Sequence, residues 1–119
     1  MLAAFVLSGC SFTSSIKQAQ PVAENFLRQM QAHRFGSAYN LVSPTAQKAS
    51  PAQIWQKDWQ TIEQKQGVVQ GWHLHSFRVS TEYADLHYQL HCAKGTAMYS
   101  FRLVPVDSQW RINGARSQY

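Results

Sequence analysis

Apolar residues recur every three or four positions as far as Gly67 and every second position after it. The first spacing places side chains on one face of a helix, and the second places them on one face of a strand. The chain therefore predicts an α+β domain in which helices precede strands. Each strand has one apolar and one polar face, so we expect N-terminal helices to cover one face of an antiparallel sheet.

The first predicted helix has Pro21 in its first turn and ends near His33 and Arg34. Its apolar stripe consists of Val22, Ala23, Phe26, Leu27 and Met30.

Two further helices are predicted before Gly67. Ser37 is expected to cap a short helix that stops at Ser43-Pro44, since the residue before proline disfavours helical geometry. Ser50 and Gln53 form a capping box for the next helix, which should end at Gly67. That helix presents Ile54, Trp55, Trp59 and Ile62.

Four strands follow, and turn signals at Lys94-Gly95 and Asp107-Ser108 separate the later ones. Short connections make an antiparallel meander the economical topology. The alternating apolar positions are Trp72 and Leu74; Ala84, Leu86, Tyr88, Leu90 and Cys92; Ala97, Tyr99, Phe101 and Leu103; and Trp110 and Ile112.

The first ten residues carry a targeting signal. An apolar run over residues 2–7 is too short to span a bilayer and leads into Ser8, Gly9 and Cys10, as in a secretory cleavage site. Leu7-Ser8-Gly9-Cys10 resembles the lipobox of bacterial lipoproteins. The resemblance implies cleavage between Gly9 and Cys10 and a diacylglycerol on the Cys10 thiol. No Lys or Arg precedes the run, so we expect the native chain to start earlier or this one to be clipped.

These expectations divide the chain into a signal peptide remnant (1–9), the lipidated cysteine with a polar linker (10–19) and one α+β domain (20–119). Ser11 follows the cysteine. In a Gram-negative cell the resemblance then implies an outer-membrane lipoprotein that faces the periplasm.

The order of elements resembles the nuclear transport factor 2-like superfamily, also called cystatin-like or ketosteroid isomerase-like. The resemblance covers residues 20–116, and its motifs are core positions. They are Ala23, Phe26, Leu27 and Met30, then Phe35, Ala38 and Tyr39, and a last strand Trp110-Arg111-Ile112-Asn113-Gly114. It implies helices packed on a curved four-stranded sheet around a cone-shaped pocket.

Seven aromatic residues are candidates to line that pocket, either as plain core or as the wall of an apolar ligand site. They are Tyr39, Trp55, Trp59, Trp72, Tyr88, Tyr99 and Phe101. Asp58 is the one carboxylate expected to face inward, unless it lies at the helix edge beside Lys57 or Lys65. An isomerase of this superfamily needs a carboxylate base and an oxyanion donor, so a lone Asp58 argues against an enzyme.

Four histidines share faces in pairs on neighbouring strands: His73 with His75, and His87 with His91. Imidazoles in a cluster can bind zinc or copper or sense pH, but no acidic or cysteine ligand accompanies them. We expect an exposed polar face, with no metal and no other cofactor. Cys92 ends an apolar series and is expected to be an inert core thiol.

Charge adds little to this picture. The net charge of +5 is spread along the chain without a basic run, so no nucleic-acid partner is indicated. It either keeps the surface solvated or attracts anionic headgroups. We expect a non-catalytic, lipid-anchored domain of the cell envelope that binds an envelope protein or component, or a second copy of itself. The alternatives are a binder of a small apolar ligand in the cone pocket and, third, an isomerase-like enzyme.

Overall fold

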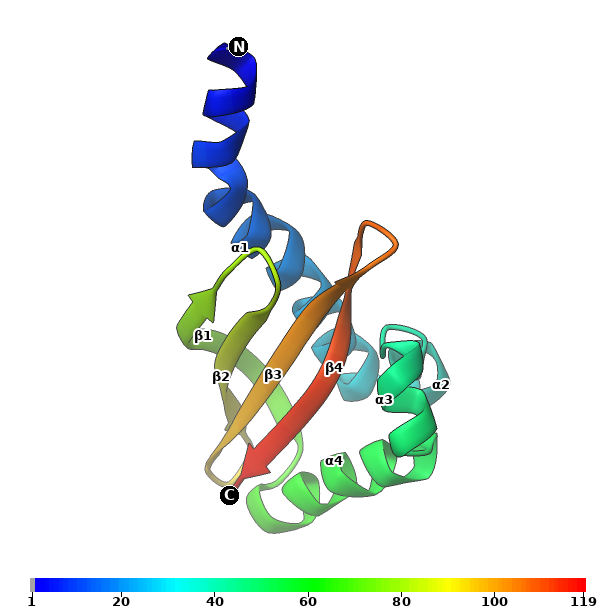
Figure 1. Ribbon diagram of the computed structural model, residues 1–119. Coiled ribbons are helices and arrows are strands. Elements are labelled where there is room, and N and C mark those ends of the chain that lie inside the picture. The colour runs from blue at the N-terminus through cyan, green and yellow to red at the C-terminus, as the bar shows by residue number, and fades with distance from the viewer. Residues whose placement is uncertain (1) are drawn as a thin grey trace.

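The computed structural model describes the backbone of residues 2–119 and the side chains of residues 15–119. In this part of the chain, helices precede a four-stranded sheet (Figure 1), so the α+β prediction is confirmed. The elements are α1 (Leu2–Gln31), α2 (Phe35–Tyr39), α3 (Pro44–Ala49), α4 (Ala52–Gln66), β1 (Val69–Val79), β2 (Ala84–Cys92), β3 (Thr96–Val106) and β4 (Gln109–Gln118).

The sheet is an antiparallel meander in the order β1-β2-β3-β4, as predicted. Asp107 and Ser108 link β3 to β4 with φ of 50° and 67°. Positive φ at both central residues is typical of a tight two-residue hairpin. Helix α1 crosses behind the sheet in Figure 1 and covers one of its faces, while no helix of residues 2–119 covers the other face.

Phe26 on α1 lies at the centre of the core. Its ring packs edge-on against Trp55 of α4 and Phe101 of β3, at centroid distances of 5.8 and 5.5 Å. It also stacks on Tyr99 at 6.3 Å. Apolar side chains of α1, α4 and all four strands thus meet in one buried cluster, at the positions that the alternation and the helical stripe predicted.

The start of the first helix was predicted wrongly. Pro21 lies inside α1, not in its first turn, and residues 15–19, predicted as linker, are helical. A proline inside a helix removes one backbone hydrogen bond. The packing of the helix against the domain has to offset this loss of stability. Ser15 and Ala19 are buried, so α1 packs on the domain on both sides of Pro21. Within the described residues, no helix is long and apolar enough to cross a membrane.

The short helices also differ from the prediction. Ser43-Pro44 does not end a helix but begins α3, because the Ser43 hydroxyl accepts a hydrogen bond from the Ala46 amide at 3.1 Å. Ser37 lies inside α2, whose N-cap is Arg34. The N-cap of α4 is Pro51, and Ser50 makes no capping bond there. Cap and stop signals share the same residues, so the sequence alone did not separate them.

Gly67 ends α4 as predicted, with φ of 89°. A Cβ at this position would lie 3.0 Å from both the Ala93 Cβ and the Lys94 amide nitrogen. The chain therefore needs glycine here, both for its positive φ and for the close approach of the turn between β2 and β3.

The strand register can be tested with two neighbouring residues of β2. Leu90 is fully buried, whereas Gln89 lies on the uncovered face. Leu90→Ala should lower the free energy of unfolding by about 2–5 kcal/mol, since it removes buried methyl groups and leaves a cavity. Gln89→Ala should change it by less than about 0.5 kcal/mol. Urea unfolding measures both, and equal losses would contradict this orientation of the strand.

Candidate functional site

A cavity of about 360 Å³ opens where α3 and α4 meet the end of β4. Small and apolar side chains of α3, α4 and β4 form much of its wall: Ala46, Ala49, Ile54 and Ala115. Polar atoms enter from Asp58 and from Asn113 and Ser117 of β4, and aromatic rings from Trp55 and Tyr99. The cavity stays open because the wall residues of α3 are too small to fill the space between α3, α4 and β4.

Asp58 is the carboxylate of this cavity. It is half-buried, and its Oδ1 accepts a hydrogen bond from the Ser117 hydroxyl at 2.7 Å. The two lysines near it in sequence do not neutralise it; the Lys65 ammonium instead lies 5.5 Å from the centroid of the Tyr119 ring. None of the side chains of residues 15–119 forms an ion pair with Asp58.

Three buried donors in or beside the cavity wall have no hydrogen-bond partner among the described residues. The Tyr99 hydroxyl and the Trp55 indole N–H belong to residues that line the cavity, and the third is the indole N–H of Trp59 in the adjoining core. The rings of Trp59 and Tyr99 are in contact, with centroids 5.7 Å apart. Burial raises the pKa of the Tyr99 hydroxyl, and the charge of Asp58 raises it further, so this hydroxyl stays protonated.

Tyr88, which pairs with Tyr99 across β2 and β3, provides the contrast. Its hydroxyl donates to Glu24 Oε2 at 3.1 Å, and Gln20 donates to the same oxygen at 2.9 Å. Burial, with Glu24 beside it, raises the pKa of the Tyr88 hydroxyl as well. Of these two fully buried tyrosines, Tyr88 therefore has a hydrogen-bond partner for its hydroxyl, and Tyr99 has none among the described residues.

Of the seven aromatic residues predicted to line a pocket, only Trp55 and Tyr99 line this cavity. Trp59, Tyr88 and Phe101 are buried core, and Trp72 is half-buried against it on β1. The hydroxyl of Tyr39 donates to the carbonyls of Gln47 and Ser50 and so ties α2 to α3. Alternation identifies inward side chains, but it cannot tell a cavity wall from a filled interior.

The sequence missed the other wall residues because they belong to α3, which was not predicted, and to the far end of β4. Ala46, Ala49 and Ser117 carry no motif. A run of small residues before Trp55 was the one signal available, and small residues alone do not indicate a site.

The four histidines do not form one cluster. His73 Nδ1 and His91 Nε2 are 2.8 Å apart, and their rings are stacked with centroids at 4.9 Å. His87 Nδ1 instead lies 2.8 Å from the Ser100 hydroxyl. A register shift between Leu74 and Ser76 leaves His75 without a partner residue on β2. Among the described residues, no three His, Cys, Asp or Glu side chains come together as metal ligands.

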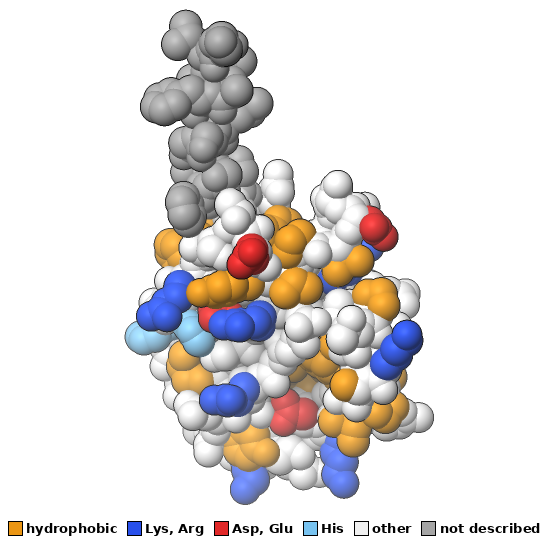
Figure 2. Space-filling model, in the orientation of Figure 1, with side chains coloured by type: hydrophobic (Ala, Val, Ile, Leu, Met, Phe, Trp, Pro, Cys, Tyr) orange, Lys and Arg blue, Asp and Glu red, His pale blue; other side chains and the backbone are white. Residues whose placement is uncertain are grey.

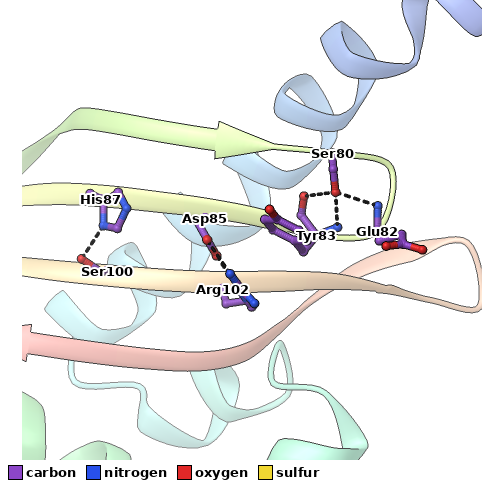
Figure 3. Close-up of polar contacts among 7 residues, drawn as sticks. All are labelled: Ser80, Glu82, Tyr83, Asp85, His87, Ser100 and Arg102. Carbon is purple, nitrogen blue, oxygen red and sulfur yellow. Dashed lines mark hydrogen bonds and ion pairs between the residues drawn. The ribbon is translucent and has the colours of Figure 1, made fainter.

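The uncovered face of the sheet has its own polar network (Figure 3). Arg102 donates two hydrogen bonds of 2.7 Å to the two carboxylate oxygens of Asp85, which lowers the pKa of Asp85. The guanidinium also lies over the ring of Tyr83, with its carbon 4.4 Å from the centroid. A hollow of about 600 Å³ on this face is lined by Asp85, His87, Ser100, Arg102, Arg116 and Gln118 among others.

The structure describes the side chain of only one of the two cysteines. Cys92 is a buried free thiol, and burial, with Glu63 nearby, raises its pKa, which disfavours the reactive thiolate. The predicted lipidation and cleavage residues, Cys10 and Gly9, lie outside the residues whose side chains are described.

Comparison with known proteins bears on the fold. No family model and no curated protein matches the chain. Among solved structures, the chain is similar to a Campylobacter jejuni protein described as a "Putative NTF2-like transpeptidase", where NTF2 stands for nuclear transport factor 2. The TM-score is 0.63 at 10% sequence identity, over 80% of this chain and 96% of the other. The chain therefore has the nuclear transport factor 2-like fold that its core residues resemble.

Proposed function

We propose that this domain is a non-catalytic binding module that holds a small molecule in the cavity between α3, α4 and β4. The observation that carries the proposal is that two residues lining this cavity, Trp55 and Tyr99, have buried donors without a hydrogen-bond partner among the described residues. This choice favours the small-ligand alternative over the envelope partner that the sequence suggested first.

The energetic argument concerns the Tyr99 hydroxyl. A buried donor without a partner costs about 1–3 kcal/mol, so folds seldom retain one without a role. Tyr99 is fully buried and lines the cavity, so we infer that a ligand acceptor would approach its hydroxyl from the cavity side. A volume of about 360 Å³ lies within the range of small-molecule sites, and two aromatic walls are typical of them.

The polar groups of the cavity are better suited to binding a ligand than to catalysing a reaction. Asp58 and Tyr99 could serve as base and oxyanion donor, but Asp58 is half-exposed and accepts from Ser117, and no second carboxylate is found among the described residues that line the cavity. The transpeptidase description of the structural neighbour implies an activated nucleophile. Neither Ser50 nor Ser117 has a hydrogen bond to a histidine among the described side chains.

The proposed binding site can be tested by titrating a small ligand and by blocking the cavity with a larger side chain. We expect 2-phenylethanol, a neutral aromatic alcohol, to shift the indole N–H signal of Trp55 saturably in NMR titration. Ala49→Trp should weaken this binding at least about tenfold, since the new side chain occupies the cavity. Thr45→Trp places the same bulk at an exposed position of α3 outside the cavity and should leave the affinity unchanged. Equal affinity in both variants would place the binding elsewhere and contradict the proposal.

The free-energy cost of the Tyr99 hydroxyl can be tested separately by comparing Tyr99 with Tyr88, its neighbour across β2 and β3. Tyr88→Phe removes a hydrogen bond to Glu24 and should lower the free energy of unfolding by about 1–3 kcal/mol. Tyr99→Phe removes a donor that has no described partner, so it should be within about 0.5 kcal/mol of the wild type or more stable. Chemical unfolding measures both. A loss at Tyr99 equal to that at Tyr88 would mean that the Tyr99 hydroxyl is satisfied within the fold.

A second candidate function uses the uncovered face of the sheet. Arg78, Arg102, Arg111 and Arg116 lie on that face by strand register, and Asp85 is their one carboxylate neighbour in the paired positions. Figure 2 shows more Lys and Arg than acidic side chains on the face it presents. Two such faces would repel each other, so an acidic envelope component fits better than a second copy.

Membrane attachment through Cys10 belongs to the same proposal, on the strength of Leu7-Ser8-Gly9-Cys10 after an apolar run. A diacylglycerol there would hold the domain at the surface of a membrane of the cell envelope, the outer membrane in a Gram-negative cell.

The anchor can be tested in cells with a complete signal peptide. Cys10→Ala should abolish acylation and move the protein out of the membrane fraction, because no other residue of the motif accepts the lipid. Ser11→Ala is the matched control and should remain acylated. Fractionation and intact-mass measurement check both; identical behaviour of wild type and Cys10→Ala, with no acyl mass, would show that the protein is not a lipoprotein.

A further inference from the structure

We propose that the molecule held in the cavity carries an ammonium group, which pairs with the carboxylate of Asp58. This inference rests on the proposed function and specifies the chemical class of the ligand. It also gives a partner to the Asp58 carboxylate and to the Tyr99 hydroxyl.

The carboxylate of Asp58 is only half-satisfied. Ser117 donates to Oδ1, and no donor to Oδ2 is found among the described residues. Within residues 15–119 Asp58 also has no ion pair, whereas Asp85 and Glu63 have Arg102 and His33 as neighbours. A half-buried carboxylate with one free oxygen can form a charge-assisted hydrogen bond to a ligand cation.

The other residues of the cavity wall also favour a cationic ligand over an anionic one. The chain has a net charge of +5, yet the described residues that line the cavity include no Lys, Arg or His. A carboxylate or phosphate ligand would meet the charge of Asp58 without any compensating cation, so the cavity disfavours anions.

Two aromatic rings flank the same space. Trp55 and Tyr99 line the cavity together with Asp58, and Phe26 packs edge-on against Trp55 and stacks on Tyr99, which fixes their positions. A cation near the face of an indole or phenol ring gains further attraction, most when it is partly desolvated. The hydroxyl of Tyr99 is still a donor and needs an acceptor. A small amine that also carries an uncharged oxygen satisfies both groups.

The experiment compares two probes of nearly equal shape. 2-Phenylethylamine is protonated at neutral pH and 2-phenylethanol is not, so they differ mainly in charge. NMR titration of the folded domain, followed at the Trp55 indole N–H, gives both dissociation constants. We expect the amine to bind about tenfold more tightly than the alcohol, the difference expected for one charge-assisted bond.

Two variants assign the preference to its residue. Asp58→Asn keeps the shape and removes the charge, so the amine should lose its tenfold advantage while the affinity for the alcohol is unchanged. Retained alcohol binding also demonstrates that the variant is folded. Glu82→Gln makes the same charge change in the exposed turn between β1 and β2 and should leave the preference intact.

Each outcome has one meaning. Equal binding of amine and alcohol to the wild type, or an amine preference that survives Asp58→Asn, overturns this inference and leaves the small-molecule site standing. If neither probe reaches the cavity, both the inference and the proposed function fail.

Discussion

The structure depends on a short backbone bridge between the loop after α2 and strand β4. The Ser43 amide donates to the Ile112 carbonyl at 2.7 Å, and the Ile112 amide donates to the Leu41 carbonyl at 2.9 Å. The buried Ser43 hydroxyl donates to Asn113 Oδ1 at 2.7 Å and accepts from the Ala46 amide. This one serine starts α3 and also fixes the helix to the strand.

The cavity is a consequence of that bridge. Once α3 is fixed to β4, its small residues Ala46 and Ala49 face the space beside α4, and nothing larger is available to fill it. The aromatic cluster around Phe26 closes the inner end. Rigid walls on three elements hold the unpaired donors in fixed positions, and such preorganisation is what a binding site needs, since little entropy is then lost when a ligand enters.

The sequence predicted the strands and the one-sided sheet because alternation over β2 and β3 is long and regular, and because a one-residue slip would have exposed Leu86, Tyr88 and Leu90. It failed at Pro21 and Ser43-Pro44, where the local signals for starting and stopping a helix coincide and distant packing decides between them. Asp58 was singled out from the sequence. Its partner Ser117, 59 positions later, was not, because that contact exists only after β4 has paired with β3.

The two faces of the sheet can have opposite electrostatic character although the chain is basic as a whole. The four arginines of the strands lie on the uncovered face, and Asp58 lies on the side of the helices. Coulomb attraction falls with distance, and salt screens charges exposed to solvent over a Debye length of about 8–10 Å. The groups nearest to Asp58 therefore have more effect on it than the arginines of the opposite face. With Ser117 as the one described group that bonds to it, the carboxylate of Asp58 sets the local potential of the cavity, so a net charge of +5 does not prevent the site from selecting a cation.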